Sequence, residues 1–278
     1  MIRTRIIPAL LAAAIAVSGV ALPGAALAAE EQIIEDVSFN HEGPFGTYDR
    51  LQLQRGFQVF QEVCSACHGL RYLSFRELGG ETGPAFPAEQ IKAIAALYDV
   101  YDPEIDDTRP AKPFDMFPAN TDAGAPDLGL MAKARAGFHG PYGSGLSQFI
   151  NGMGGPEYIY SMLTGYSGEE IEEAGAILYE NHTFPGGKIS MPPPLEEGLV
   201  EYVMHGGEGE GESHAGEAPE ATVEQMAEDV SAFLVWAAEP QLVERKKAGL
   251  RNILMLLTLT VLLYFTNKAL WAKIKRKE

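Results

Sequence analysis

The chain has 278 residues, with 38 acidic and 21 basic side chains and a formal net charge of −17 at pH 7. So large an acidic excess repels nucleic acid and attracts cationic partners, which argues against a nucleic-acid-binding function. With only two cysteines, the chain can hold neither a disulfide framework nor a four-cysteine zinc site.

The first 28 residues have the pattern of a secretory signal peptide. Arg3 and Arg5 give a basic start, an apolar stretch follows, and Ala26-Leu27-Ala28 supplies the small residues that precede a cleavage site. The alternative is an N-terminal membrane span, but prolines and glycines within the stretch weaken such a helix. We therefore expect residues 1–28 to be removed and residues 29–244 to form an exported domain. That domain carries 37 acidic and 10 basic side chains, a formal charge of −27.

Residues 51–63 predict a helix that runs directly into the two cysteines. Leu53, Phe57, Phe60 and Val63 recur at the spacing of one helical face. Gly56 lies within this helix and weakens it, so we expect a close contact at that position.

The cysteines stand in Cys64-Ser65-Ala66-Cys67-His68, which is the attachment pattern of c-type haem. Thiols three positions apart can reach both vinyl groups of one porphyrin edge, and the adjacent histidine presents imidazole to the iron. A thioredoxin-like redox pair needs a βαβ context, a zinc site needs more ligands, and a Cys-x-x-Cys disulfide closes almost no chain entropy. The sequence therefore predicts one covalent haem c with His68 as an axial ligand.

The ligand opposite His68 decides between electron transfer and chemistry at an open iron, because a methionine there gives a six-coordinate iron of raised potential. Met191 is the favoured candidate, since the prolines that follow it at 192–194 fix a stiff, extended loop. Met204 is the main rival and His205 a weaker one. The other downstream methionines are Met116, Met131, Met153, Met162 and Met226, of which the last two lie in helical stretches and are expected in the core.

Two features precede the C-terminal region. Residues 206–220 (GGEGEGESHAGEAPE) form an acidic, Gly-rich insertion, which predicts a mobile, solvated loop that either attracts a basic cytochrome or is a tolerated surface insertion. Thr222 and Gln225 then have capping-box spacing and open a predicted helix that ends at Glu239-Pro240. Four histidines show no convergent spacing and are expected at ordinary surface or loop positions: His41, His139, His182 and His214.

Residues 250–271 predict a membrane anchor. The 19 residues from Ile253 to Trp271 would span about 28 Å as a helix, close to the thickness of the hydrocarbon layer. A buried core helix would have a polar face, and this segment has none. Basic residues flank it on both sides, so the signal peptide decides the orientation. We expect a single-pass protein of the cell inner membrane, with its domain in the periplasm and residues 272–278 as a basic cytoplasmic tail.

A series of further motifs follows in order between about Phe45 and Lys277. They are Arg55-Gly56-Phe57-Gln58-Val59-Phe60, Pro126-Asp127-Leu128, Ala134-Arg135-Ala136, Gly155-Pro156-Glu157-Tyr158-Ile159-Tyr160, Leu163-Thr164-Gly165-Tyr166, Met191-Pro192-Pro193-Pro194 and Phe233-Leu234-Val235-Trp236-Ala237-Ala238-Glu239-Pro240. With the haem motif and the anchor, this combination resembles the cytochrome c1 family, the haem subunits of quinol–cytochrome c oxidoreductase (bc1) complexes, and its bacterial branch most of all.

The resemblance implies a set of site residues. They are Cys64 and Cys67 for covalent attachment, His68 and Met191 for the iron, Arg135 for a haem propionate, and Tyr158, Pro126, Asp127 and Leu128 close to the haem. Some bacterial relatives carry an extra cysteine pair between the two axial ligands. This chain lacks it, so that brace cannot operate here.

The resemblance also implies a fold and a function. The fold is expected to be mainly α, a cytochrome c-type haem domain with long loops plus one C-terminal transmembrane helix. The chain would accept an electron from the Rieske iron–sulfur subunit and pass it to a soluble cytochrome c, beside cytochrome b in a dimeric membrane complex. The alternatives are an anchored cytochrome c carrier outside a quinol-oxidising complex, and a haem peroxidase or gas sensor with an open iron.

Overall fold

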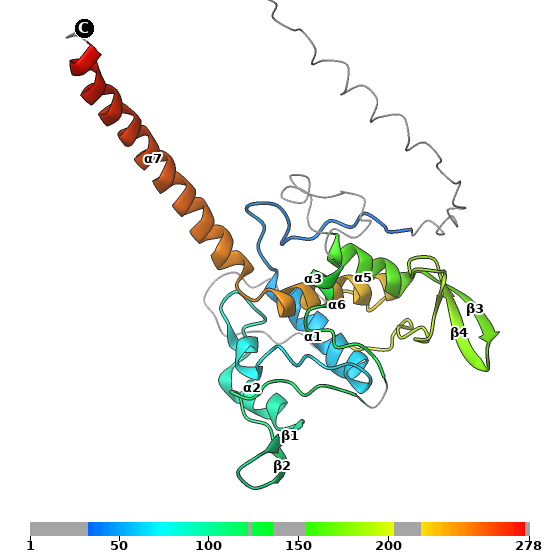
Figure 1. The fold of residues 1–278 in the computed structure, drawn as a ribbon. Helices are drawn as coiled ribbons and strands as arrows, with labels where there is room; N and C mark the ends of the chain where they lie inside the picture. The colour runs from blue at the N-terminus through cyan, green and yellow to red at the C-terminus, as the bar shows by residue number, and fades with distance from the viewer. Residues whose placement is uncertain (1–32, 122–123, 136–153, 203–217, 276–278) are drawn as a thin grey trace, which may run out of the picture. The chain divides into compact units, whose positions relative to one another are not determined.

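The computed structural model describes residues 33–121, 124–135, 154–202 and 218–275 (Figure 1). It is mainly helical, as the sequence predicts, with short strands between the helices. In chain order the elements are α1 (Arg50–Glu62), two 3₁₀ helices (Cys64–Ala66 and Phe75–Gly79), α2 (Ala88–Ala95), β1 (Asp99–Asp102), β2 (Asp107–Pro110), α3 (Met131–Ala134), α5 (Gly155–Thr164), β3 (Tyr166–Glu173), β4 (Ala176–Asn181), β5 (Lys188–Ile189), α6 (Val223–Ala238) and α7 (Leu242–Lys275).

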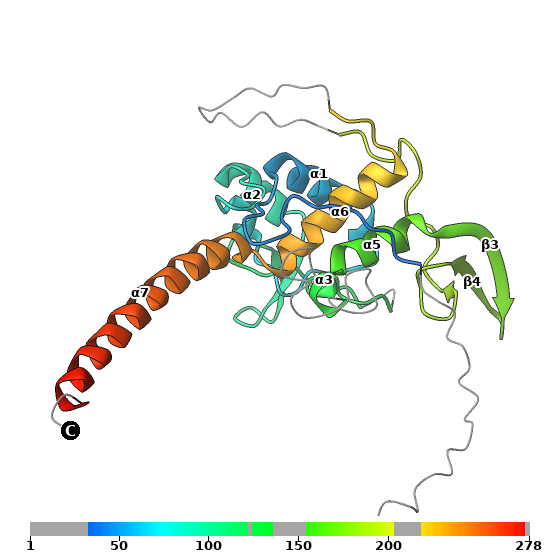
Figure 2. The ribbon, with the colours of Figure 1, turned by 90° about the horizontal axis from the view of Figure 1, so that it is seen from above.

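Helices α1 and α6 pack against each other, and α5 lies along α6 (Figure 2). The α1–α6 crossing depends on Gly56, as its position predicts. A Cβ atom there would lie 2.0 Å from the Asp229 carbonyl oxygen and 2.7 Å from Phe233 Cβ. Only a glycine therefore allows the two backbones to approach so closely.

The ends of both helices are fixed by side chains. Asp49 Oδ1 accepts a hydrogen bond from the Leu51 N–H at 2.8 Å, which caps α1. Thr222 Oγ1 accepts from the Gln225 N–H at 3.1 Å, which confirms the predicted start of α6. Each cap satisfies a backbone donor that the helix itself leaves unpaired.

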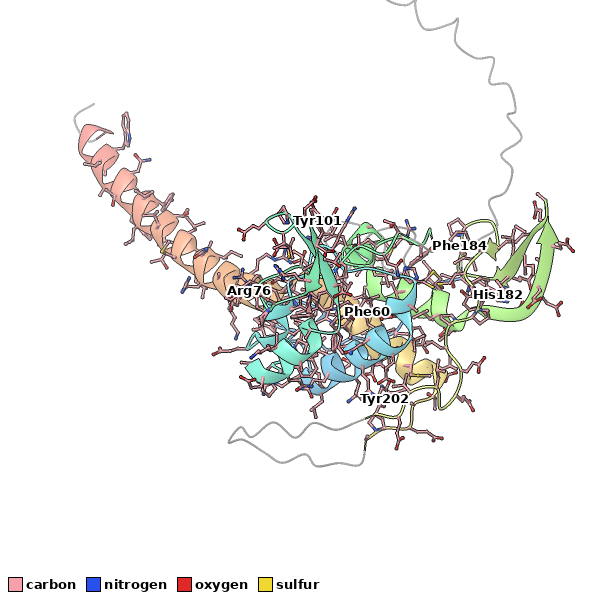
Figure 3. The ribbon with its side chains drawn as sticks, turned by 90° about the horizontal axis from the view of Figure 1, so that it is seen from below. Phe60, Arg76, Tyr101, His182, Phe184 and Tyr202 are labelled. Atoms are coloured by element: carbon pink, nitrogen blue, oxygen red, sulfur yellow. The ribbon has the colours of Figure 1, made fainter. Side chains whose placement is uncertain are left out.

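Aromatic side chains from these helices form part of the core. Phe57, Phe60, Phe233 and Trp236 are all buried. The ring centroids of Phe57 and Phe233 lie 5.5 Å apart, and those of Phe60 and Phe233 lie 5.9 Å apart. Figure 3 labels Phe60 among the side chains that fill this region. Met226 is also fully buried, as predicted.

An ion pair joins the same two helices. Arg55 Nε and a terminal nitrogen of its guanidinium donate to the two carboxylate oxygens of Asp229 at 2.8 and 2.9 Å. The Asp229 side chain is fully buried and that of Arg55 is nearly so. A bidentate geometry of this kind compensates part of the cost of removing both charges from water.

The sequence did not predict the strands. β1 pairs antiparallel with β2, and β3, β4 and β5 form a three-stranded antiparallel sheet in that order. The β3–β4 turn consists of Ala174 and Gly175, whose φ angles are both positive, at 53° and 83°. Two consecutive positive φ angles are typical of the tight turns that match the twist of a hairpin.

Helix α7 is long and apolar enough to cross a membrane, with a mean hydropathy of 1.7 over its most apolar part. It begins at Leu242, eight residues before the expected start of the anchor at 250. Leu242 and Val243 are buried, and Lys246 Nζ donates to the carbonyl oxygens of His41 and Gly46. The first turns of α7 therefore belong to the domain rather than to the span.

One histidine differs from its expected setting. His41 is buried, with 6% of its surface exposed, and its ring centroid lies 5.4 Å from that of Phe39 and 5.3 Å from that of Tyr48. Burial lowers the pKa of its imidazole to about 4, so the ring is neutral at pH 7. His182 is exposed, as expected. His139, His205, His214, Met153, Met204 and most of the 206–220 insertion lie outside the described residues.

Candidate haem-binding site

The two cysteines lie on a tight turn that continues from α1. Residues Cys64–Ala66 form a 3₁₀ helix, and the Cys64 carbonyl oxygen accepts from the N–H groups of Cys67 at 3.1 Å and His68 at 2.9 Å. Ser65 Oγ donates to the Gln61 carbonyl oxygen at 2.7 Å, which ties the turn back to α1. Both thiols and the imidazole are thus presented by one compact stretch of backbone.

The orientation of His68 is set by a single hydrogen bond. Its Nδ1 lies 2.7 Å from the Pro126 carbonyl oxygen. A carbonyl oxygen can only accept, so Nδ1 carries the proton and Nε2 keeps its lone pair. Metal-binding histidines are held in the correct tautomer by this type of contact. Pro126 therefore lies beside His68.

The rest of the Pro126-Asp127-Leu128 segment is tied to the residues that follow the haem motif. The Leu128 N–H donates to the Gly69 carbonyl oxygen at 2.9 Å. Asp127 Oδ2 accepts from the Arg71 N–H at 3.0 Å. These bonds join two parts of the chain that are 56 or more residues apart and hold them as one wall of the site.

A cavity of about 270 Å³ opens next to the motif. Its lining combines His68 and Ser65 with aromatic residues and a loop: Phe60, Tyr98, Phe117 and Pro118–Thr121. Asn120 Nδ2 donates to the Ala66 carbonyl oxygen at 2.9 Å. A Cβ atom on Gly69 would lie 2.6 Å from the Pro118 carbonyl oxygen, so the loop packs directly on the motif. Sequence reasoning missed this loop, because no spacing or charge pattern links it to the cysteines.

Arg135 and Tyr158 form a separate pair. The Arg135 guanidinium carbon lies 5.3 Å from the centroid of the Tyr158 ring, and Tyr158 has only 2% of its surface exposed. Burial raises the pKa of the Tyr158 hydroxyl, and the positive charge of Arg135 opposes that shift. Arg135 Nε is buried and has no hydrogen-bond partner among the described residues. A buried guanidinium N–H of this kind is suited to a carboxylate ligand such as a haem propionate.

Met191 lies just beyond β5 and packs, half-buried, against the core. Its carbonyl oxygen accepts a hydrogen bond from Tyr166 Oη at 3.0 Å. Tyr166 is the first residue of β3, so the small sheet holds the loop that carries the predicted second ligand. Nothing in the sequence pointed to this role of the sheet.

The competing uses of the cysteines find little support. Burial raises the pKa of the Cys64 thiol to about 12, whereas a reactive or metal-binding cysteine needs a lowered pKa. Among the described residues, no three His, Cys, Asp or Glu side chains are placed to hold a metal ion. The cysteines also follow a helix, where a thioredoxin-like pair would follow a strand.

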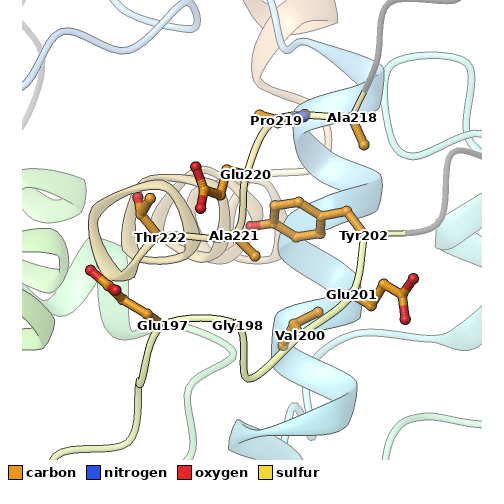
Figure 4. Close-up of a pocket in the computed structure, with 10 residues that line it drawn as sticks. All are labelled: Glu197, Gly198, Val200, Glu201, Tyr202, Ala218, Pro219, Glu220, Ala221 and Thr222. Carbon is orange, nitrogen blue, oxygen red and sulfur yellow. The ribbon is translucent and has the colours of Figure 1, made fainter.

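A second, larger cavity of about 630 Å³ lies elsewhere (Figure 4). It is lined by Glu197–Tyr202 without Leu199 and by Ala218–Thr222, and it contains none of the predicted haem residues. Three glutamates rim it: Glu197, Glu201 and Glu220. Its lining among the described residues includes no cysteine, histidine or methionine, so these residues offer no ligand for haem iron.

The residues of the motif fit a haem, because they combine two thiols with an imidazole whose Nε2 lone pair is free. Away from the motif, Arg135 has a buried Nε without a hydrogen-bond partner among the described residues, which fits a propionate. Comparison with known proteins agrees with this chemistry. The sequence matches the Cytochrome C1 family over residues 39–274. It is 47% identical to cytochrome c1 of Cereibacter sphaeroides over 289 residues, which covers 96% of this chain and 95% of that protein.

Mitochondrial proteins are similar over most of the chain as well. One, from Candida albicans, is named cytochrome b-c1 complex catalytic subunit, and is 36% identical over 91% of this chain and 83% of its own length. Another, from Saccharomyces cerevisiae, is named cytochrome c1, heme protein, and is 35% identical over 87% of this chain and 73% of its own length. The chain belongs to the cytochrome c1 family.

Proposed function

We propose that this chain is the electron-transfer haem subunit of a cytochrome bc1 complex, with one haem c bonded to Cys64 and Cys67. The observation that carries the proposal is the hydrogen bond from His68 Nδ1 to the Pro126 carbonyl oxygen, because it directs Nε2 and its lone pair to a metal. A haem held there would supply an iron that can accept and release one electron.

The protein's own residues would hold that group in place. His68 and Met191 would bind the iron, with Tyr166 restraining the Met191 backbone. Arg135 would pair with a propionate, and Tyr158 would keep its guanidinium in position. Pro126 and Leu128 would lie beside the haem edge, since both are tied to the His68–Gly69 segment. None of these roles requires a catalytic base or a nucleophile.

The partners follow from the family. A relative is named as a subunit of a cytochrome b-c1 complex, which supports assembly of this chain with cytochrome b. Within such a complex the chain would receive its electron from the Rieske iron–sulfur subunit and deliver it to a soluble cytochrome c. We further infer that the complex is dimeric. The acidic charge of residues 29–244 would attract a cationic acceptor.

The location follows from the two ends of the chain. We infer that residues 1–28 are cleaved, that the haem domain lies in the periplasm, and that α7 anchors it in the cell inner membrane. Residues 272–278 would then form the basic tail on the cytoplasmic side.

The test is purification from membranes in mild detergent through a tag on this chain. We expect cytochrome b and an iron–sulfur protein to co-purify, and the reduced haem to leave carbon monoxide unbound. A chain that isolates alone would favour an anchored carrier outside a quinol-oxidising complex. A reduced protein that binds carbon monoxide would favour an open-iron sensor or peroxidase instead.

A further inference from the structure

Glu157 is the most unusual side chain outside the haem site. It lies in the first turn of α5, it is completely buried, and neither of its carboxylate oxygens has a hydrogen-bond partner among the described residues. The N-terminus of a helix stabilises a nearby anion only weakly. Burying an ionised carboxylate without partners costs far more than that.

A second carboxyl group faces it. Glu42, in the segment before α1, interacts with Glu157 through its side chain. Glu42 Oε2 accepts from the Phe39 N–H at 3.3 Å, while Oε1 is buried and without a partner among the described residues. Two ionised carboxylates can only accept hydrogen bonds, so they cannot bond to each other. A single proton makes one of them a donor, so that the two carboxyl groups can bond to each other.

The charges around the pair do not supply a compensating cation. The segment that carries Glu42 also carries Asp36, which repels both carboxylates, and His41, which is neutral. From α7, Lys246 attracts Glu42, but its ammonium group donates to two backbone carbonyl oxygens. Burial is the largest cause of the raised pKa of both glutamates.

The other helices that pack on α5 commit their charges elsewhere. Arg55 pairs with Asp229 of α6, and Lys133 of α3 pairs with Glu239 at 2.7 Å. The backbone N–H of Glu35 donates to Ser161 Oγ of α5 at 2.8 Å. Arg135, next to α3, stacks on Tyr158. The Glu42–Glu157 pair therefore has no guanidinium or ammonium partner among the described side chains.

Glu157 directly precedes Tyr158 in α5, and the Tyr158 ring contacts Arg135, whose Nε is buried without a hydrogen-bond partner among the described residues. The propionate role proposed for Arg135 would bring the haem close to this part of α5. A charge that changes there would act on the carboxyl pair through a protein interior of low effective dielectric, where screening by salt is weak.

We propose that Glu42 and Glu157 bind one shared proton at neutral pH, and that reduction of the haem beside Arg135 increases their affinity for it. The second half of this proposal rests on the proposed function. At an alkaline pH where the oxidised protein has lost this proton, one electron enters from the donor subunit, the solvent supplies the proton, and the charge of the pair moves from minus two towards minus one. By linkage, a proton that binds more tightly to the reduced protein raises the potential at low pH.

The experiment is a redox titration of the membrane-purified holoprotein between about pH 6 and about pH 10. This range lies above the pKa of an ordinary carboxyl group, so exposed carboxylates stay ionised throughout it. We expect the midpoint potential of the natural protein to fall across part of this range. A tenfold difference in proton affinity between the two oxidation states would separate the acid and alkaline plateaus by about 59 mV. Glu157→Gln, whose amide can donate to Glu42 as the proton does, should give a nearly flat profile.

Two further variants sharpen the result. Glu42→Gln should flatten the profile in the same way, because it removes the other half of the pair. Glu35→Gln changes the same charge on the same segment at an exposed position, and should leave the profile as in the natural protein. Infrared spectra of these proteins should show a protonated carboxyl band near neutral pH that disappears in Glu157→Gln.

The outcomes separate the claims. Absence of the carboxyl band from the natural protein at neutral pH would overturn the shared proton. A band with identical potential profiles in the natural protein and Glu157→Gln would overturn the linkage to the haem. If none of the proteins showed a reversible one-electron couple, the proposed function would be wrong, while the band would still test the pair.

Discussion

The hydrogen bond between His68 and the Pro126 carbonyl oxygen leaves the imidazole with one nitrogen able to bind iron. The second ligand that we propose, Met191, lies in a proline-rich loop, and its carbonyl oxygen accepts a hydrogen bond from Tyr166 Oη. Both positions can be tested with single substitutions, because a thioether ligand and a hydrocarbon side chain of similar size differ in what they offer the metal.

Met191→Leu should lower the midpoint potential and allow the reduced protein to bind carbon monoxide, since leucine fills the space but cannot coordinate iron. Redox titration and absorption spectroscopy with and without carbon monoxide measure both effects. Met204→Leu is the matched control and should leave both unchanged. If Met204→Leu produced the change and Met191→Leu did not, the ligand assignment would be wrong.

Because His41 is buried, we expect the free energy of unfolding to fall in mild acid. Its pKa is about 4 in the folded protein, where burial opposes the charge, and 6.5 is its ordinary value. The folded state binds fewer protons at this site than the unfolded state, so stability is full above pH 6.5 and falls as the pH drops towards 4. Between about pH 7 and about pH 5 we expect a loss of about 2 kcal/mol from this group.

Denaturant unfolding of the detergent-solubilised protein at the two pH values measures this loss. His41→Phe retains a ring between Phe39 and Tyr48 and cannot titrate, so its stability should change less over the same interval. Equal losses in the natural protein and in this variant would show that other groups cause the acid sensitivity.

At the scale of elements, the α1–α6 crossing organises the domain. Gly56→Ala would place a Cβ atom 2.0 Å from the Asp229 carbonyl oxygen and force the helices apart. We expect a loss of about 3 kcal/mol, because overpacking at a backbone contact outweighs the gain in helix propensity. Denaturant unfolding monitored by circular dichroism provides the measurement.

Gly249→Ala is the control for that substitution. Gly249 also lies in a helix, but a Cβ atom there would meet nothing within 4 Å. Its stability should stay the same or rise slightly. If the Gly56→Ala protein were as stable as the control, a Cβ atom at position 56 could not lie as close as 2.0 Å to the Asp229 carbonyl oxygen, and the close helix crossing would be wrong.

The sequence is sufficient to predict helices α1 and α6. The predicted stretch 51–63 matches α1 at Arg50–Glu62, and Thr222 caps α6 as its spacing predicts. Both helices have apolar residues at a clear 3.6-residue period, and local hydrogen bonds fix their starts. The Cys64–His68 motif is recognisable from its spacing alone, and haem attachment there stays a prediction.

The strands could not be predicted from the sequence. The β3–β4 strands are largely exposed and rich in glutamate, so they lack the alternation of apolar and polar residues that indicates a strand. Their turn is Ala174-Gly175 rather than Asn-Gly or Asp-Gly, the usual signal of a hairpin. The burial of His41 and the packing of Pro118 on Gly69 depend on contacts distant in sequence, and no local pattern encodes them.

At the scale of the whole molecule, α7 divides into two parts. Its first turns are bound to the domain through Leu242, Val243 and Lys246, and its apolar part is exposed, as a lipid-facing helix would be. A chain that ends at Arg251 should therefore fold, attach haem and, in cells without the partner subunits, appear in the soluble periplasmic fraction. Fractionation and haem staining measure this. Retention in salt-washed membranes would show that another segment anchors the protein.

The proposed electron transfer depends on a haem that is attached through both sulfurs. Mass spectrometry of the proteolytic peptide that contains Cys64 and Cys67 tests this most directly. We expect the peptide to carry the mass of one haem, with both thiols blocked to alkylation. A peptide with two free thiols, or one with only the mass change of a disulfide, would contradict it.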